Sequence, residues 1–105
     1  MNTDLTPLPR VGILGGTGDQ GRGLALRLAV SGLTVTLGSR DAHRAHAIAA
    51  DLGHGVLAGD NRQCAAEADL VIVAVPYAGH AELLASLSTE LAGKVVIDCV
   101  NPLGF

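Results

Sequence analysis

The chain has 105 residues and a formal net charge of −3, and only seven of its residues are lysine or arginine. This length suits one domain with one core, and the absence of a basic stripe argues against nucleic acid as a partner. Apolar residues make up 49% of the chain but aromatic ones only 2%. The core must therefore consist of valine, leucine, isoleucine and alanine, as in a sheet covered by small-residue helices.

No apolar run reaches the roughly 18 residues that a membrane-spanning helix needs. The polar start, Met1 to Pro9, lacks the apolar segment of a signal peptide. We therefore expect no membrane partner and a cytoplasmic location. The cysteines, Cys64 and Cys99, form neither a C-x-x-C pair nor a metal-ligand cluster. Cys99 lies in an apolar strand pattern and is expected to be a small buried side chain.

Strand and helix signals alternate through the first two thirds of the chain. The pattern predicts strands at 11–15, 34–38 and, more weakly, 55–59, with helices at 20–31, from a cap at Asp41 to Leu52, and from a cap at Asn61 to Ala68. The second of these helices is amphipathic. Its apolar face is formed by Ala45, Ile48, Ala49 and Leu52.

The apolar run Leu70–Val75 is short and does not alternate, so it predicts a central parallel strand buried on both faces. A helix at 79–92 and a strand at 94–100 follow. This alternation predicts an α/β fold, a Rossmann-like doubly wound parallel sheet with strand order 3-2-1-4-5 and helices on both faces. We expect residues 1–105 to form one nucleotide-binding domain. Such sheets commonly have a sixth strand, so the chain could be a fragment of a longer protein.

The segment Gly15–Gly21 joins the first strand to the first helix and fits the dinucleotide fingerprint G-x-G-x-x-G at Gly16, Gly18 and Gly21. Gly16 is expected to permit the tight turn, Gly18 to let a pyrophosphate approach the backbone, and Gly21 to let the helix pack on the strand. The helix N-terminus offers free N–H groups to the anion. A purely structural turn is the alternative, but the strand before and the helix after favour a dinucleotide site.

The residues after the second strand favour NADP over NAD. NAD sites usually place a carboxylate there to accept the ribose 2′-hydroxyl, whereas this chain has Ser39 and Arg40. Ser39 can donate to a 2′-phosphate, Arg40 can bind it through two hydrogen bonds, and Arg44 lies one helical turn further on. Asp41 also stands where a ribose acceptor could lie. In the simpler alternative, Asp41 caps the helix and the arginines are solvated.

Two loops are expected to border the nicotinamide half, namely Val75-Pro76-Tyr77 and Asn101-Pro102-Leu103. Their backbone groups can hold the ribose or the carboxamide, and Tyr77 can stack near the ring. The prolines could equally do no more than end their strands. His80 is a candidate acid or base, although a partly exposed histidine at a helix start is the simpler interpretation.

Four segments together resemble the NADPH-dependent coenzyme F420 reductases, also called F420H2:NADP oxidoreductases. They are Gly15–Ala25, Gly38–Arg40, Val75–Tyr77 and Asp98–Leu103. The resemblance spans almost the whole chain, and its most specific part is the GGTG opening with the later Ser-Arg pair. It implies reversible hydride transfer between NADP and the deazaflavin F420 in a homodimer, with orientation and exclusion of water supplied by the protein.

The resemblance also assigns residues to the cofactor. The loop from Thr17 through Asp19 to Gln20 would hold the pyrophosphate, and no catalytic side chain is implied. The 2′-phosphate would contact Ser39, Arg40 and Arg44, and the nicotinamide would be bordered by Val75, Pro76 and Asn101. Members of this family continue well beyond Phe105, and that further part carries much of the F420 pocket and the dimer contact.

Two other functions remain open. A non-catalytic NADP-binding module or redox sensor is favoured by the shortness of the chain. A different NADP dehydrogenase, such as an imine or β-hydroxyacid reductase, would need a proton donor, usually a lysine on a later helix. Only Lys94 is present, at the expected start of a strand, so this class ranks last.

Overall fold

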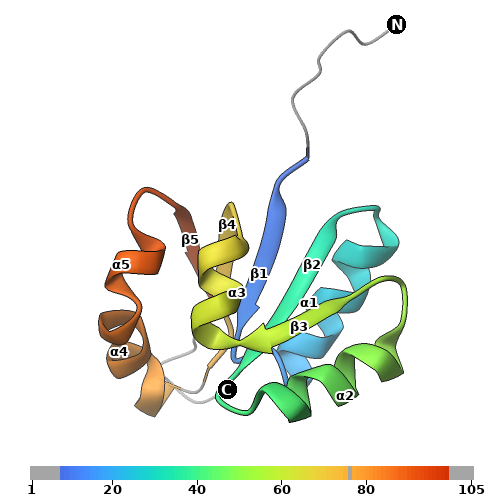
Figure 1. Cartoon of the computed structure of the whole chain (residues 1–105), viewed down its shortest axis with the longest axis horizontal. Coiled ribbons are helices and arrows are strands. Elements are labelled where there is room, and N and C mark those ends of the chain that lie inside the picture. Colours follow the sequence, from blue (N-terminus) through green and yellow to red (C-terminus); the bar gives the residue numbers. More distant parts are fainter. Residues whose placement is uncertain (1–7, 76, 100–105) are drawn as a thin grey trace, which may run out of the picture.

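The computed structural model describes residues 8–75 and 77–99. Its five strands form one parallel sheet of order β3-β2-β1-β4-β5 (Figure 1). The strands are β1 (Arg10–Leu14), β2 (Thr34–Ser39), β3 (Leu57–Asp60), β4 (Leu70–Val73) and β5 (Val95–Asp98). The helices are α1 (Asp19–Val30), α2 (Ala42–Leu52), α3 (Asn61–Glu67), α4 (Tyr77–Ser86) and α5 (Ser88–Leu91). The predicted fold class and strand order are confirmed.

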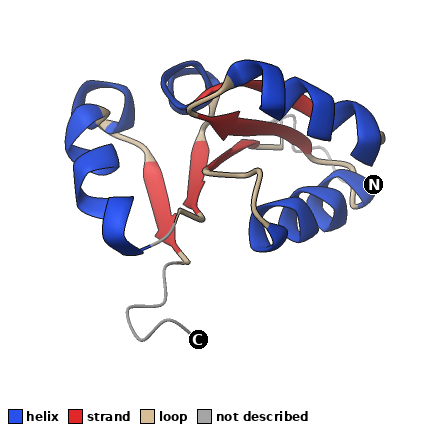
Figure 2. Ribbon diagram, turned by 90° about the horizontal axis from the view of Figure 1, so that it is seen from below, coloured by secondary structure: helices blue, strands red, loops and turns tan. Residues whose placement is uncertain are grey.

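Helices cover both faces of the sheet and create two apolar cores (Figure 2). Side chains alternate between the faces of a strand, so Val11 and Ile13 of β1 pack with α1 and α2, while Leu14 packs with α3 and α4. The central strand β4 contributes to both cores. Its Val71 and Val73 are fully buried on one side, and Ile72 is 7% exposed on the other, as the unbroken apolar run predicted.

Two glycines in the central strands let α3 lie directly on the sheet. A Cβ at Gly12 would stand 2.9 Å from the Cβ of Ala68 and from the Sγ of Cys64, and one at Gly38 would stand 2.9 Å from Cys64 Cβ. Cys64 is consequently buried, and its thiol donates to the Thr36 carbonyl oxygen at 3.4 Å. Burial raises the pKa of the Cys64 thiol to about 12, which keeps it protonated and unreactive at neutral pH.

The third strand and third helix differ from their predicted bounds. Strand β3 begins at Leu57 because Gly55 adopts a left-handed conformation (φ 77°) in the preceding turn. The predicted cap at Asn61 is wrong, since Asp60 is the N-cap of α3 and its carboxylate accepts from Gln63 N at 2.7 Å. Asn61 lies in the first turn and is buried.

The last predicted helix and strand are also corrected. The helix expected at 79–92 is divided into α4 and α5, because Leu87 leaves helical geometry (φ −110°, ψ 15°) while its side chain is buried in the core. Strand β5 covers only Val95–Asp98, and the end of the predicted strand lies outside the described residues. Cys99 follows β5 and is half-buried, not fully buried as expected.

We expect Gly12→Ala to destabilise the fold, because the new methyl group would meet both Ala68 and the rigidly held Cys64. Overpacking of this kind costs about 1–3 kcal/mol in the free energy of unfolding. Gly23→Ala in α1 is the matched control. A Cβ there meets nothing within 4 Å, and alanine favours a helix by up to about 1 kcal/mol over glycine. Denaturant unfolding should show a lower free energy of unfolding for Gly12→Ala and a higher one for Gly23→Ala, each relative to the unaltered chain. Equal stabilities of the two variants would refute the close packing of α3.

Candidate dinucleotide site

The turn between β1 and α1 lies at the carboxyl edge of the sheet, the lower edge in Figure 1, and backbone contacts attach it to both neighbouring strands. Gly16 N donates to the Gly38 carbonyl oxygen at 2.9 Å, next to the end of β2. Ala74 N, just after β4, donates to the Leu14 carbonyl oxygen at 2.9 Å. The turn therefore lies where the strand order reverses, which is the usual binding crevice of an open α/β sheet.

The predicted role of Gly16 in the turn is wrong, whereas that of Gly21 agrees with the structure. The left-handed residue is Gly15 (φ 67°), not Gly16, so the tight turn depends on Gly15. Gly16 is needed for close approach, because a Cβ there would stand 2.9 Å from the Ile13 carbonyl oxygen. At Gly21, a Cβ would stand 2.6 Å from Gly16 Cα, so the predicted packing of the helix on the strand end is confirmed.

Gly18 faces open space. It is the N-cap of α1 with extended backbone (φ −78°, ψ 173°) and provides no side-chain cap, and a Cβ there would meet no atom within 4 Å. The first intrahelical bond runs from Arg22 N to the Gly18 carbonyl oxygen at 3.0 Å. The N–H groups of Asp19, Gln20 and Gly21 therefore have no intrahelical acceptor, which is the arrangement that binds a phosphate at a helix N-terminus.

Asn61 is a structural partner of the turn that the sequence interpretation assigned wrongly. Its side chain reaches from α3 across the sheet end, where Oδ1 accepts from Gly15 N at 3.2 Å. Asn61 thereby supplies an acceptor for the Gly15 N–H, which the left-handed turn removes from the hydrogen bonding of the sheet. Its sequence position, directly after the β3 end, was the available signal, because the ends of parallel strands meet at one edge of the sheet.

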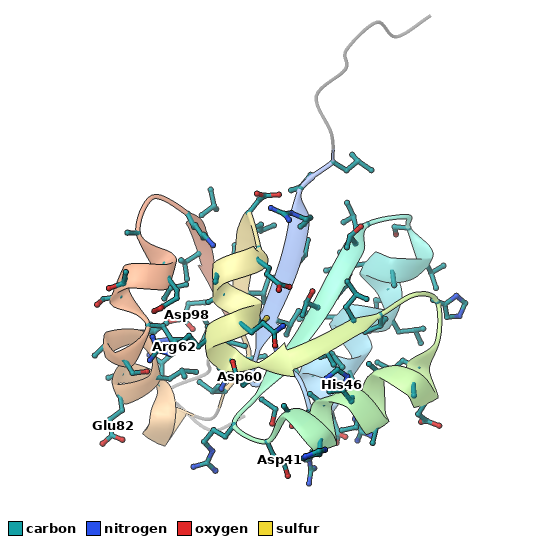
Figure 3. The ribbon with its side chains drawn as sticks, in the orientation of Figure 1. Asp41, His46, Asp60, Arg62, Glu82 and Asp98 are labelled. Carbon is teal, nitrogen blue, oxygen red and sulfur yellow. The ribbon has the colours of Figure 1, made fainter. Side chains whose placement is uncertain are left out.

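The last residues of β2 and those that follow it lie beside the turn, because Gly16 bonds Gly38. Ser39 is buried and its Oγ accepts from Asp41 N at 3.1 Å, which leaves the hydroxyl proton for another acceptor. Arg40 and Arg44 are exposed, and neither guanidinium has an ion pair or hydrogen bond within the described part of the chain. Asp41 is the N-cap of α2, with Oδ1 accepting from His43 N at 3.0 Å and Arg44 N at 3.3 Å (Figure 3).

The segment after β4 also reaches the turn. Val75 lies so close to Gly15 that a Cβ on that glycine would stand 3.0 Å from Val75 Cα. Tyr77 opens α4, whereas Pro76 and Asn101, both predicted to border the nicotinamide, lie outside the described residues. The structure thus places the turn, the β2 end and Val75 at one edge, and their contact with a dinucleotide stays a prediction.

Two titratable side chains near the site, and the lysine at the far end of the sheet, have partners within the protein. Asp19 pairs with Arg22 at 2.8 Å, so its negative charge is partly compensated beside the helix N-terminus. His80 Nε2 lies 2.7 Å from Asp98 Oδ2. Lys94 lies at the other end of the sheet, where its ammonium group caps α3 by donating to the carbonyl oxygens of Ala65 and Ala66.

Other features of the described residues contribute nothing to this site. An open groove runs along β3 and contains none of the predicted site residues. Its lining is His46, Ala49, Ala50, Val56, Leu57, Ala58, Gln63 and Glu67. Across 8–75 and 77–99 no helix combines the length and apolar character needed to cross a bilayer. Within the same ranges no three His, Cys, Asp or Glu residues are grouped as metal ligands.

Comparison with known proteins agrees with this geometry. The family described as NADP oxidoreductase coenzyme F420-dependent matches residues 10–102. The chain is 40% identical over 101 residues to the F420-dependent NADP reductase of Methanothermobacter thermautotrophicus, covering 90% of this chain and 44% of the relative. It is 37% identical over 94 residues to the rat metalloreductase STEAP3, covering 90% of this chain and 18% of that protein.

A similar solved structure comes from Arthrobacter sp. FB24 and is assigned as an F420-dependent NADP reductase. It superposes with a TM-score of 0.80 at 30% identity, over 90% of this chain and 46% of the other. The chain spans less than half the length of the F420-dependent relatives it matches. The family match nevertheless covers most of the present sequence, and the chain belongs to the family of coenzyme F420-dependent NADP oxidoreductases.

Proposed function

We propose that residues 1–105 form the NADP(H)-binding domain of an F420-dependent NADP reductase. The observation that carries the proposal is the open position of Gly18 at an N-terminus of α1 that no side chain caps. A pyrophosphate there would accept from the free N–H groups of the first turn. Asp98, Val75 and the β2 end border the same edge of the sheet, so a dinucleotide of the usual length would extend across the switch point.

The residues after β2 support NADP over NAD. The 2′-phosphate is a dianion, and Arg40 and Arg44 are two exposed guanidinium groups without partners among the described residues. The Ser39 hydroxyl is placed to donate, since its oxygen already accepts from Asp41 N. Asp41 is engaged as a helix cap, which makes it less available as the ribose acceptor of an NAD site.

The proposed reaction is hydride transfer between the bound nicotinamide and F420. The hydride chemistry belongs to the two cofactors, and the protein contributes binding and orientation. The Gly15–Gly21 turn would hold the pyrophosphate, and Val75 would border the nicotinamide. No catalytic side chain is proposed, because the hydride passes directly between the two cofactors. We extend the proposal to a cytoplasmic homodimer. The open edge of the sheet at β5, with Val95 63% and Ile97 45% exposed, supports further association.

A second candidate is an NADP-binding module without catalysis. Such a module would use the β1–α1 turn and the β2 end in the same way as the reductase, so measurement of turnover is what separates the two candidates. Lys94 is not placed to act as the proton donor of an imine or β-hydroxyacid reductase, because it caps α3 at the far end of the sheet.

The helix N-terminus can be tested with Gly18→Asp. The backbone at Gly18 suits any residue, and an aspartate N-cap should stabilise α1 by a few tenths of a kcal/mol relative to glycine. The same carboxylate would compete for the free N–H groups and repel the pyrophosphate, lowering NADPH affinity by about tenfold or more. Calorimetric titration and thermal unfolding should show these opposite effects. Gly18→Ser, which caps without charge, is the control, and unchanged NADPH binding by Gly18→Asp would exclude this turn from the site.

The 2′-phosphate site can be tested with Arg40→Ala. Loss of a charged hydrogen bond is worth about 1.5–3 kcal/mol, or roughly tenfold to over a hundredfold in affinity. The affinity for NADPH should fall by this factor while that for NADH changes little. Arg27→Ala is the control, because Arg27 is exposed in the last turn of α1, at the other end of that helix. Equal losses for both dinucleotides would remove Arg40 from the 2′-phosphate site.

Activity separates the enzyme from the module. The chain is mixed with NADPH and F420, and the absorbance of both is followed while light scattering gives the molecular mass. Simultaneous loss of both absorbances by a dimer is the expected result for a reductase. NADPH binding without turnover would support the module, and the full-length protein would then be assayed in the same way. Failure of NADPH to bind at all would contradict both candidates.

A further inference from the structure

A histidine and a carboxylate join the two segments that leave β4 and β5. His80 is in the first turn of α4, and Asp98 is the last residue of β5. The Nε2 atom of His80 lies 2.7 Å from Oδ2 of Asp98, and the histidine side chain is 18% exposed. The Nε2 atom is buried and is not aligned with a hydrogen-bond acceptor, so the contact with Asp98 is a close approach of the two polar atoms and not a well-aligned hydrogen bond.

This contact stands out because the start of α4 has little other anchorage among the described side chains. Gly79, Ala81 and Glu82 are exposed, and the apolar packing of α4 begins only at Leu83 and Leu84. Among the described side chains, His80 is therefore the one that connects the first turn of α4 to the sheet. Because Asp98 is held in the sheet opposite Val73, the pair fixes the helix start to a rigid strand end.

The same pair lies beside both segments that leave the carboxyl edge. Val75, two residues before α4, is in contact distance of the phosphate turn at Gly15. On the other side, Cys99 N donates to the Val73 carbonyl oxygen at 3.0 Å, directly after Asp98. A shift of the α4 start relative to β5 would therefore change the separation of these two segments.

We propose that the His80–Asp98 pair positions the nicotinamide half of the bound dinucleotide, by holding the segment after β4 at a defined distance from the end of β5. The proposal rests on the proposed NADP site. His80 is a positioning residue here and not a catalytic one, because its Nε2 is buried against Asp98. The adenosine half binds at the β1–α1 turn and after β2, so the pair should leave that half unaffected.

Asp98→Asn tests this assignment, because it removes the charge while keeping the shape of the side chain. Binding is measured for NADPH and for 2′,5′-ADP, which carries the adenosine and its 2′-phosphate but no nicotinamide. We expect the affinity for NADPH to fall by about three- to tenfold, the range for loss of a partly exposed charged contact. The affinity for 2′,5′-ADP should change by less than about twofold. His80→Gln should give the same split, and the double variant should be no weaker than either single one.

Glu90→Gln is the matched control. Glu90 pairs with Arg62 at 2.7 Å, and its side chain is 15% exposed, so it resembles the His80–Asp98 contact in length and burial. Arg62 extends from α3 and also donates to the Ser86 carbonyl oxygen at 3.2 Å (Figure 3). Loss of this pair should lower the thermal unfolding midpoint. It should not change the affinity for NADPH relative to that for 2′,5′-ADP.

The outcomes are distinguishable. Equal weakening of NADPH and 2′,5′-ADP in Asp98→Asn and His80→Gln, or no weakening of either, would overturn the positioning role. A difference between the losses of NADPH and 2′,5′-ADP affinity in Glu90→Gln as large as that in Asp98→Asn would also overturn the positioning role. Loss of any ion pair would then be enough to produce the difference. If the unaltered chain binds neither ligand, the proposed NADP site itself fails, and that result is seen before any variant is made.

Discussion

At the end of β1, two backbone segments touch with no side chain between them, and the candidate site depends on this contact. A Cβ at Gly21 would stand 2.6 Å from Gly16 Cα, so only glycine lets the first turn of α1 lie on the end of its strand. The bond from Gly16 N to the Gly38 carbonyl oxygen then joins β2 to the same turn. The helix N-terminus is thereby fixed over the carboxyl edge of the sheet, where Gly18 leaves room for an anion.

The opposite face of the sheet supports the turn by the same means. Gly12 and Gly38 let α3 approach the central strands, and the first turn of α3 brings Asn61 to the Gly15 amide. The turn is thus held by one hydrogen bond from β2 and one from α3 before any ligand arrives. A preformed site of this kind loses little conformational freedom on binding, and more of the contact energy therefore appears as affinity.

Local electrostatics make an anion site plausible in a chain with a net charge of −3. The acidic residues near the turn are engaged, Asp19 with Arg22 and Asp41 with the first turn of α2. The guanidinium groups of Arg40 and Arg44 stay available within the described structure. A site needs only a few such groups, because helix amides and nearby cations act over short distances in salt solution.

Sequence alone determined the elements whose signal is local. The apolar run at Leu70–Val75 predicted the central strand, and the glycine spacing at Gly16, Gly18 and Gly21 predicted the turn, because burial and backbone freedom leave direct marks on residue type. The alternation of strand and helix signals predicted the strand order. Tertiary structure decided which glycine turns and which residue caps. Gly15 has the left-handed conformation and lies against Val75, whereas Asp60 caps α3 and Asn61 bonds Gly15. Tertiary packing also divides the last predicted helix at the buried Leu87 and brings His80 against Asp98. Such contacts connect residues distant in sequence, and only the folded chain determines which of them meet.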